Sequence, residues 1–403
     1  MVWDWLTRIF RRRSKDIYLI EAADFEEGGG NSAYDPSVAQ IGDSINWLEV
    51  DDNLWGVRVL DVRPVTHTML LVTGNHQFAS NAVSWRADHG TSFIDEEPPV
   101  ARTVETNLRY PIDQPLIDGV LFTPDEMEHK WALFYHLGKI ICVDSWSRQV
   151  RVVARVEVSD NYVEITEVHG TFFTDEEEPE FTVRALDFLL RSHALETEYP
   201  APLPPGIVPD SRAAAEWCMI KFGNRASFAT QHQIVYLDPE KPLRTNSLLH
   251  IAVARGDESA VETQLASGVP INLLARDGLA PLHWALACED TAMMALLLNR
   301  GSPVDVRTSE GPTPLVLAAQ SGSIAKVTFL LDHGADVDAR TEGKGTALLH
   351  AVGMGHFGVV KVLLDRGASQ NIEAQGHSPR SIAEARGAAE IVALLDKHDA
   401  SAN

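Results

Sequence analysis

Thr313-Pro314-Leu315-Val316 is one of three similar segments that decide the fold of the last third of this chain. The other two are Ala280-Pro281-Leu282-His283 and Thr346-Ala347-Leu348-Leu349. The three segments begin 33 residues apart. The same interval separates four glycines: Gly268, Gly301, Gly334 and Gly367. A fixed period of this length is typical of helix pairs stacked side by side. Because such a stack offers a long surface and each repeat touches only its neighbours, the pattern predicts recognition rather than catalysis.

From Thr245 onward, over about 150 of its 403 residues, the sequence resembles the ankyrin repeat family. Where that family has Thr-Pro-Leu-His-x-Ala, this chain has five related segments, starting at Ser247, Ala280, Thr313, Thr346 and Ser378. Thr or Ser before a helix accepts hydrogen bonds from first-turn amides, and Pro suits the first helical position. The resemblance implies an all-α solenoid over residues 245–403 whose last unit, with Arg380 and Ser381, is a polar cap.

Glycines are expected to end the first helix of most repeats, where a left-handed residue is needed: Gly256, Gly322, Gly355 and Gly387. Asp290 takes the place of this glycine in the second repeat, so we expect a turn closed in a different way there.

The resemblance also implies where a protein partner binds, namely at the finger tips and on the exposed face of the first helices. The tip positions are Arg276, Asp277, Leu279, Arg307, Thr308, Glu310, Arg340, Glu342 and Lys344. The helix-face positions are Trp284, Glu289, Gln320, His350 and Met354. Trp284 is the strongest candidate, because tryptophan is over-represented among binding hot spots. The alternative for Trp284 is packing against the linker or the N-terminal domain.

His250 and His283 occupy the buried histidine position of the family and are expected to be structural hydrogen-bonding groups. No cysteine or carboxylate pattern completes a metal site around them. We therefore expect no metal and no cofactor.

The charge of the chain indicates which partners to expect, and its cysteines indicate the compartment. The net charge is −23; residues 1–244 carry 22 Lys and Arg against 39 Asp and Glu, and residues 245–403 carry 12 against 18. A field of that sign repels phosphate backbones, so nucleic acid is not expected as a partner. The three cysteines are widely spaced and odd in number, which favours a reducing, cytoplasmic location.

Residues 1–199 are predicted to form an α+β domain of no recognised family. Short β-branched or aromatic runs at 131–136, 139–144, 149–158 and 162–168 predict an antiparallel meander with one solvated face. Earlier runs at 55–62 and 66–72 predict two further strands, and the spacing of Val183, Leu186 and Leu190 predicts a helix after the sheet.

A proline-rich stretch at 200–210 is predicted to be a semi-rigid linker. Residues 211–244 are interpreted as a helix that caps the open end of the stack, or alternatively as a degenerate repeat. At the N-terminus, residues 1–13 combine Trp3, Leu6 and Phe10 with three arginines. That combination suits an anionic membrane surface, but a helix docked on the first domain or a frayed end is the favoured interpretation.

Two functions remain open. The favoured one is an adaptor or scaffold that holds a protein partner on the repeat stack. The alternative is an enzyme of hydrolase type in residues 1–199 whose target is selected by the repeats. Cys142, Ser145 and several histidines could be grouped in space, but no nucleophile elbow, phosphate loop or His-Glu-x-x-His motif is present. We assign no catalytic residue, and we expect Cys142 to be a core thiol.

Overall fold

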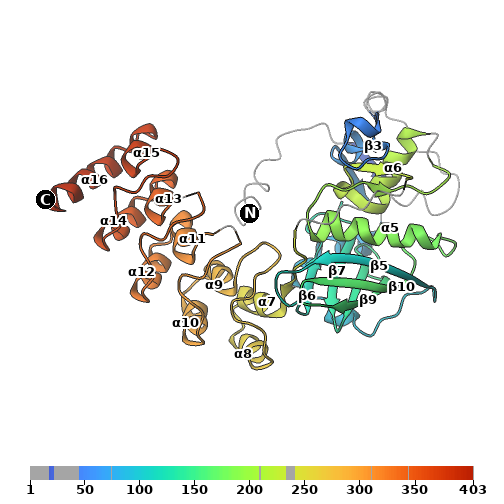
Figure 1. Ribbon diagram of the computed structural model, residues 1–403, viewed down its shortest axis with the longest axis horizontal. Helices are drawn as coiled ribbons and strands as arrows, with labels where there is room; N and C mark the ends of the chain where they lie inside the picture. The colour runs from blue at the N-terminus through green and yellow to red at the C-terminus, as the bar shows by residue number, and fades with distance from the viewer. Residues whose placement is uncertain are drawn as a thin grey trace. The chain divides into compact units, whose positions relative to one another are not determined.

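The computed structural model describes residues 18–21, 45–73, 75–207, 210–232, 241–309, 311–343 and 345–402 (Figure 1). The chain divides into two compact units, Met1–Asn246 and Ser247–Asn403, which are described separately. The membrane prediction for residues 1–13 and the candidate tip residues Glu310 and Lys344 lie outside the described residues.

The first unit is built on a large antiparallel sheet. Strands β6 to β10 form a meander, and β5 pairs with β10 on its other side. Their bounds are β5 (Thr103–Pro111), β6 (Gly119–Phe122), β7 (Trp131–His136), β8 (Lys139–Asp144), β9 (Val150–Val158) and β10 (Tyr162–Gly170). The predicted meander is confirmed to within two residues. Leu137 and Gly138 join β7 to β8 with φ values of 50° and 72°, as a two-residue hairpin turn requires.

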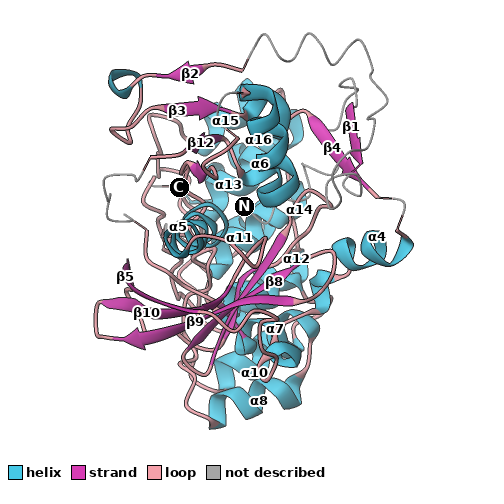
Figure 2. Ribbon diagram, turned by 90° about the vertical axis from the view of Figure 1, so that its right-hand side faces the viewer, coloured by secondary structure: helices cyan, strands magenta, loops and turns pink. Residues whose placement is uncertain are grey.

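The prediction of one solvated face is wrong for the centre of this sheet. Every residue of β6 and β7 is buried, and only the strands near β5 alternate. One face is covered by α5 (Pro179–Leu189), and α6 (Ser211–Phe222) packs on α5 farther from the sheet (Figure 2). On the other face, Trp85 and Phe93 pack on Phe134, with ring centroids 6.1 and 5.8 Å away. Aromatic residues outside the strands thus replace solvent.

A smaller sheet completes the first unit, in the order β11-β12-β3-β2. Its strands are β11 (Ala201–Pro202), β12 (Phe228–Thr230), β3 (Val59–Asp61) and β2 (Trp47–Leu48), and a separate parallel pair joins β1 (Tyr18–Glu21) to β4 (Met69–Val72). The predicted strands at 55–62 and 66–72 are shorter than expected, because α3 (Arg63–Thr66), with Pro64 in its first turn, lies between them. Helix α4 (His76–Val83) follows β4.

The proline-rich stretch is part of this domain and not a spacer. Ala201 pairs with Ala229, and the Leu203 amide donates to the Thr230 carbonyl at 2.8 Å. Pro202 is tolerated because β11 is an edge strand. Helix α6 likewise packs in the core of the first unit through Ala214, Cys218 and Phe222, so it belongs to this unit and not to the repeat array. Both segments belong to the first unit for the same reason: their apolar side chains are buried in its core.

The second unit is an array of five helix pairs. The helices are α7 (Leu248–Arg255), α8 (Glu258–Ala266), α9 (Pro281–Trp284), α10 (Ala292–Asn299), α11 (Pro314–Ser321), α12 (Ile324–Asp332), α13 (Ala347–Met354), α14 (Phe357–Asp365), α15 (Pro379–Ala385) and α16 (Ala389–Ala402). Each predicted repeat start is the N-cap of a first helix. Gly256, Gly322 and Gly355 end their helices in the left-handed conformation, as predicted. β13 (Asn246–Ser247) lies where the two units meet in sequence.

The second repeat departs from the others at the turn between its helices. Helix α9 has four residues and continues as a 3-10 turn, Ala285–Ala287. The 33-residue register from Gly256 reaches Glu289, so Glu289 and not Asp290 occupies the place of the glycine. Lys326 closes the turn instead: its Nζ donates to the carbonyls of Leu286 and Cys288, at 2.7 Å each.

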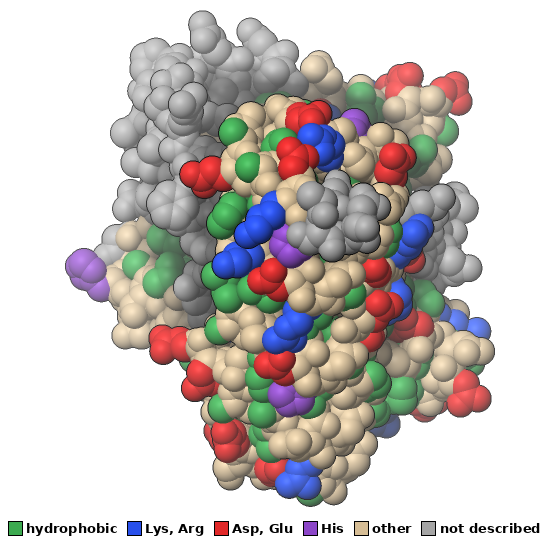
Figure 3. All heavy atoms as spheres, turned by 90° about the vertical axis from the view of Figure 1, so that its left-hand side faces the viewer, with side chains coloured by type: hydrophobic (Ala, Val, Ile, Leu, Met, Phe, Trp, Pro, Cys, Tyr) green, Lys and Arg blue, Asp and Glu red, His purple; other side chains and the backbone are tan. Residues whose placement is uncertain are grey.

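The last repeat closes the array with charged side chains. Arg380 pairs with Glu384 and Asp396, and His398 lies 3.4 Å from Asp365. Figure 3 looks toward this end of the array and shows acidic and basic side chains interspersed. A polar outer face is what a solenoid end exposed to water requires.

Candidate functional site

The residues predicted to bind a partner differ widely in exposure. Arg307, Arg340, Glu342, Glu289 and Met354 are exposed, whereas Thr308 is buried and cannot offer its side chain to a partner. The remaining described candidates are partly buried: Arg276, Asp277, Leu279, Trp284, Gln320 and His350.

The finger tips are held together before any partner arrives. Arg307 Nη1 donates to the Gly311 carbonyl at 2.8 Å within its own tip and to the Arg340 carbonyl at 2.7 Å in the next. The Ser309 amide donates to the Gly278 carbonyl at 2.9 Å, which links the preceding tip. Because three successive tips are hydrogen-bonded to one another, a partner meets an ordered row and does not have to order it.

Trp284 connects a finger tip to a helix. Its Nε1 lies 3.4 Å from Asp277 Oδ1, and its ring stands edge-on to His250 with a centroid distance of 5.3 Å. Asp277 Oδ1 also accepts the Leu279 amide at 2.9 Å. Burial raises the pKa of the Asp277 carboxyl, and these hydrogen bonds oppose the rise. Trp284 is thus half-buried, and a carboxylate fixes the orientation of its ring.

His250 and His283 are structural, as predicted. His250 Nδ1 lies 2.9 Å from Ser247 Oγ and its Nε2 lies 3.2 Å from the Leu279 carbonyl. His283 Nδ1 accepts the Ala280 amide at 3.2 Å, and its Nε2 lies 3.3 Å from the Pro312 carbonyl. Each ring therefore ties the start of one first helix to the finger of the next repeat. Burial lowers the pKa of both histidines to about 4.

The helix-face candidates form one further pair. Gln320 Nε2 donates to His350 Nδ1 at 3.0 Å, which joins two neighbouring repeats, and burial lowers the pKa of His350. Glu289 and Met354 do not join this surface. They lie at the opposite end of the first helices, in or beside the turns that lead to the second helices.

Comparison with known families gives the same assignment for this unit. Residues 249–341 match the family model for ankyrin repeats in three copies, and residues 345–375 match the model of a single ankyrin repeat. The second unit contains ankyrin repeats. The fifth helix pair, α15 and α16, lies beyond the matched residues and continues the stack. No curated protein matches the chain.

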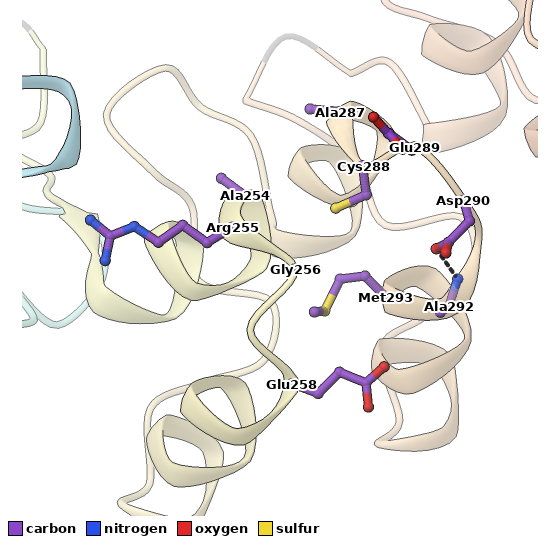
Figure 4. A pocket seen from close by; sticks show the side chains of 10 residues that line it. All are labelled: Ala254, Arg255, Gly256, Glu258, Ala287, Cys288, Glu289, Asp290, Ala292 and Met293. Carbon is purple, nitrogen blue, oxygen red and sulfur yellow. Dashed lines mark hydrogen bonds between the residues drawn. The ribbon is translucent and has the colours of Figure 1, made fainter.

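A cavity that sequence reasoning missed lies between the first and second ankyrin repeats, with a volume of about 340 Å³. Cys288 Sγ and Met293 point toward its centre, and Arg255 points away (Figure 4). Its lining residues are Ala254, Arg255, Gly256, Glu258, Ala287, Cys288, Glu289, Asp290, Ala292 and Met293. The signal in the sequence was the missing glycine, because Glu289, which stands in its place, lines this cavity.

In the first unit, the side chains considered for catalysis have structural partners. Cys142 is fully buried in the core, as expected, and burial raises its pKa. Ser145 Oγ donates to the His129 carbonyl at 2.7 Å, and His136 Nε2 lies 2.7 Å from the His89 carbonyl. Among the described residues there is no group of three or more side chains that could hold a metal ion. None of the described helices has both the length and the apolar character that a membrane crossing requires.

Proposed function

We propose that this protein is an adaptor or scaffold that holds a protein partner against the finger tips and first helices of its ankyrin array. The ankyrin repeats support a role in protein–protein interaction. We choose this face because its finger tips are ordered by hydrogen bonds. Arg307 links two tips, and Asp277 in a third tip fixes the indole of Trp284. Pre-ordered groups lose little conformational entropy on binding.

The chemistry of this face suggests what the partner presents. Two exposed arginines, Arg307 and Arg340, can pair with carboxylates, and the half-buried Trp284 provides an aromatic ring at the tip that contains Asp277. We infer a partner segment with an apolar anchor next to acidic residues. Its affinity should fall with salt, because the arginines are solvent-accessible.

Affinity capture with the full-length protein tests the proposal. Trp284→Ala and Arg307→Ala are compared with Lys361→Ala, which changes an exposed residue of α14 outside the proposed face. Proteins that bind through this face should be captured by the wild type and by Lys361→Ala and lost from the other two variants. An identical set of captured proteins for all four would reject this face as the binding surface.

We further propose that the first unit does not act as an enzyme and that the protein works in the cytoplasm. The fully buried Cys142 thiol and the engaged Ser145 hydroxyl support the first point. All three cysteines are free thiols, which suits a reducing compartment. Labelling with an active-site hydrolase probe tests catalysis, since specific labelling of the first unit would overturn it. Cell fractionation tests the location.

A further inference from the structure

A row of equivalent residues runs along the end of the ankyrin array that lies farthest from the finger tips. Glu258, Thr291, Ile324 and Phe357 follow the 33-residue register. The last repeat begins 32 residues after the fourth, so Ala389 takes the equivalent place there, and the exposed Glu390 follows it and ends the row. Each lies at or next to the start of a second helix. A first helix of eight residues, about 12 Å long, separates this end from the tips, so the row is a surface of its own.

The middle of the row is apolar and exposed. Ile324 is 49% exposed, Phe357 41% and the neighbouring Met354 55%, and these are the exposed large hydrophobic residues of the described array. Ile324 lies against the backbone of Gly358, because a Cβ there would come within 2.5 Å of Ile324 Cδ1. The apolar surfaces of two repeats are therefore continuous.

The turns that carry this surface are locked together. His356 Nε2 lies 3.0 Å from the Gln320 carbonyl of the preceding repeat. A Cβ on Gly322 would come within 2.8 Å of His356 Cε1, so the imidazole lies directly over this glycine. A partner can bind a rigid apolar surface of this kind without first having to order it.

Both ends of the row are acidic. Glu258 and Glu390 are exposed, and in the described part of the chain neither has an ion-pair partner. Glu258 also lines the 340 Å³ cavity together with Glu289 and Asp290 (Figure 4). This cavity can admit a long basic side chain. Charge complementarity thus calls for a partner that is apolar at its centre and basic at both ends.

We propose that this row binds an amphipathic basic helix of a partner protein, as a second docking surface beyond the finger-tip face. Neighbouring helices of a stack lie about 8–10 Å apart. Residues seven apart on a helix lie on one face and are separated by about 10.5 Å, which matches this step. Residues three apart on a strand cover about 10 Å but point to opposite faces, so a strand does not match.

The spacing defines a peptide that tests the proposal. It has about 29 residues, is rich in alanine, carries leucines seven apart for Ile324 and Phe357, and has a lysine at each end for Glu258 and Glu390. Binding of the labelled peptide to the full-length protein is measured by fluorescence anisotropy. We expect replacement of the leucines by serine, or of the lysines by glutamate, to weaken binding by about tenfold.

Variants of the protein make the test specific. Ile324→Ser and Phe357→Ser should each weaken binding of the peptide about tenfold, whereas Val83→Ser, at an exposed valine of the first unit, should not. The double variant Glu258→Lys/Glu390→Lys should prefer the glutamate-ended peptide. Circular dichroism confirms that each variant is folded.

Two outcomes overturn the proposal: equal binding to the serine variants and the wild type, or no change of preference after charge reversal. Trp284→Ala should leave binding of this peptide unchanged. Failure of this row is thus distinguishable from failure of the finger-tip face.

Discussion

Acidification should destabilise the ankyrin array, because two of its histidines are buried in the neutral form. Burial lowers the pKa of His250 and of His283 from 6.5 to about 4. The unfolded chain takes up a proton near pH 6.5, while the folded array does so only near pH 4. Their contribution to stability is therefore complete above pH 6.5 and is lost as the pH falls from 6.5 toward 4.

The size of the loss follows from these pKa values. One pKa unit corresponds to about 1.4 kcal/mol, so at pH 5 each histidine lowers the free energy of unfolding by about 2 kcal/mol relative to pH 7. The two together amount to about 4 kcal/mol, a large fraction of the stability of an ordinary domain. His350, whose pKa is also lowered by burial, acts in the same direction.

Urea unfolding followed by hydrogen exchange and mass spectrometry measures the loss within peptides from residues 247–402. The matched variants are His250→Gln/His283→Gln, which cannot be protonated, and His377→Gln, which changes an exposed histidine. The first should be less stable at pH 7 but lose much less stability at pH 5, and the second should behave like the wild type. A wild-type loss below about 1 kcal/mol, or an undiminished loss in the double variant, would refute the reasoning.

Other substitutions test separate features of the structure by urea or thermal unfolding. Gly355→Ala should lower the free energy of unfolding by about 1 kcal/mol, because the φ of 77° at this glycine disfavours a residue with a Cβ. No atom lies within 4 Å of the Cβ position, so this cost comes from the backbone alone. Gly311→Ala should lower the free energy of unfolding by more than Gly355→Ala does, because the φ is 92° and the Cβ would also come within 2.9 Å of Glu342 Cγ. An equal loss for the two variants would mean that the finger tips move apart at little cost. Asp187→Asn should lower the free energy of unfolding of the first unit by about 3 kcal/mol. The reason is that buried Asp187 accepts hydrogen bonds from the Tyr110 hydroxyl at 2.6 Å and from Arg191 Nε at 2.8 Å. A change below about 1 kcal/mol would contradict a stabilising role for these hydrogen bonds.

Local patterns predicted the elements whose causes are themselves local. The repeat starts at Ser247 and Thr346 were readable because a hydroxyl that caps a helix needs only its own first turn, which the Ser247 and Thr346 side chains provide. The left-handed Gly322 and the hairpin at Leu137 and Gly138 were readable for the same reason. Likewise, alternation of residue types located the strands of the meander. The binding face came from family resemblance, and the structure alone showed that Thr308 is buried and that Met354 lies at the other end of the helices.

Segments whose fate depends on distant partners could not be predicted in this way. Ala201 and Pro202 looked like a linker, yet they form a strand because β12 lies beside them. Helix α6 looked like a cap for the stack, yet its apolar face is buried in the first unit. The exposed row of Ile324 and Phe357 exists only because the stack places residues 33 positions apart side by side. The sequence by itself determined the repeat, its caps and the meander, whereas the tertiary structure decided what is buried and which surfaces are continuous, because burial depends on residues that are far apart in the chain.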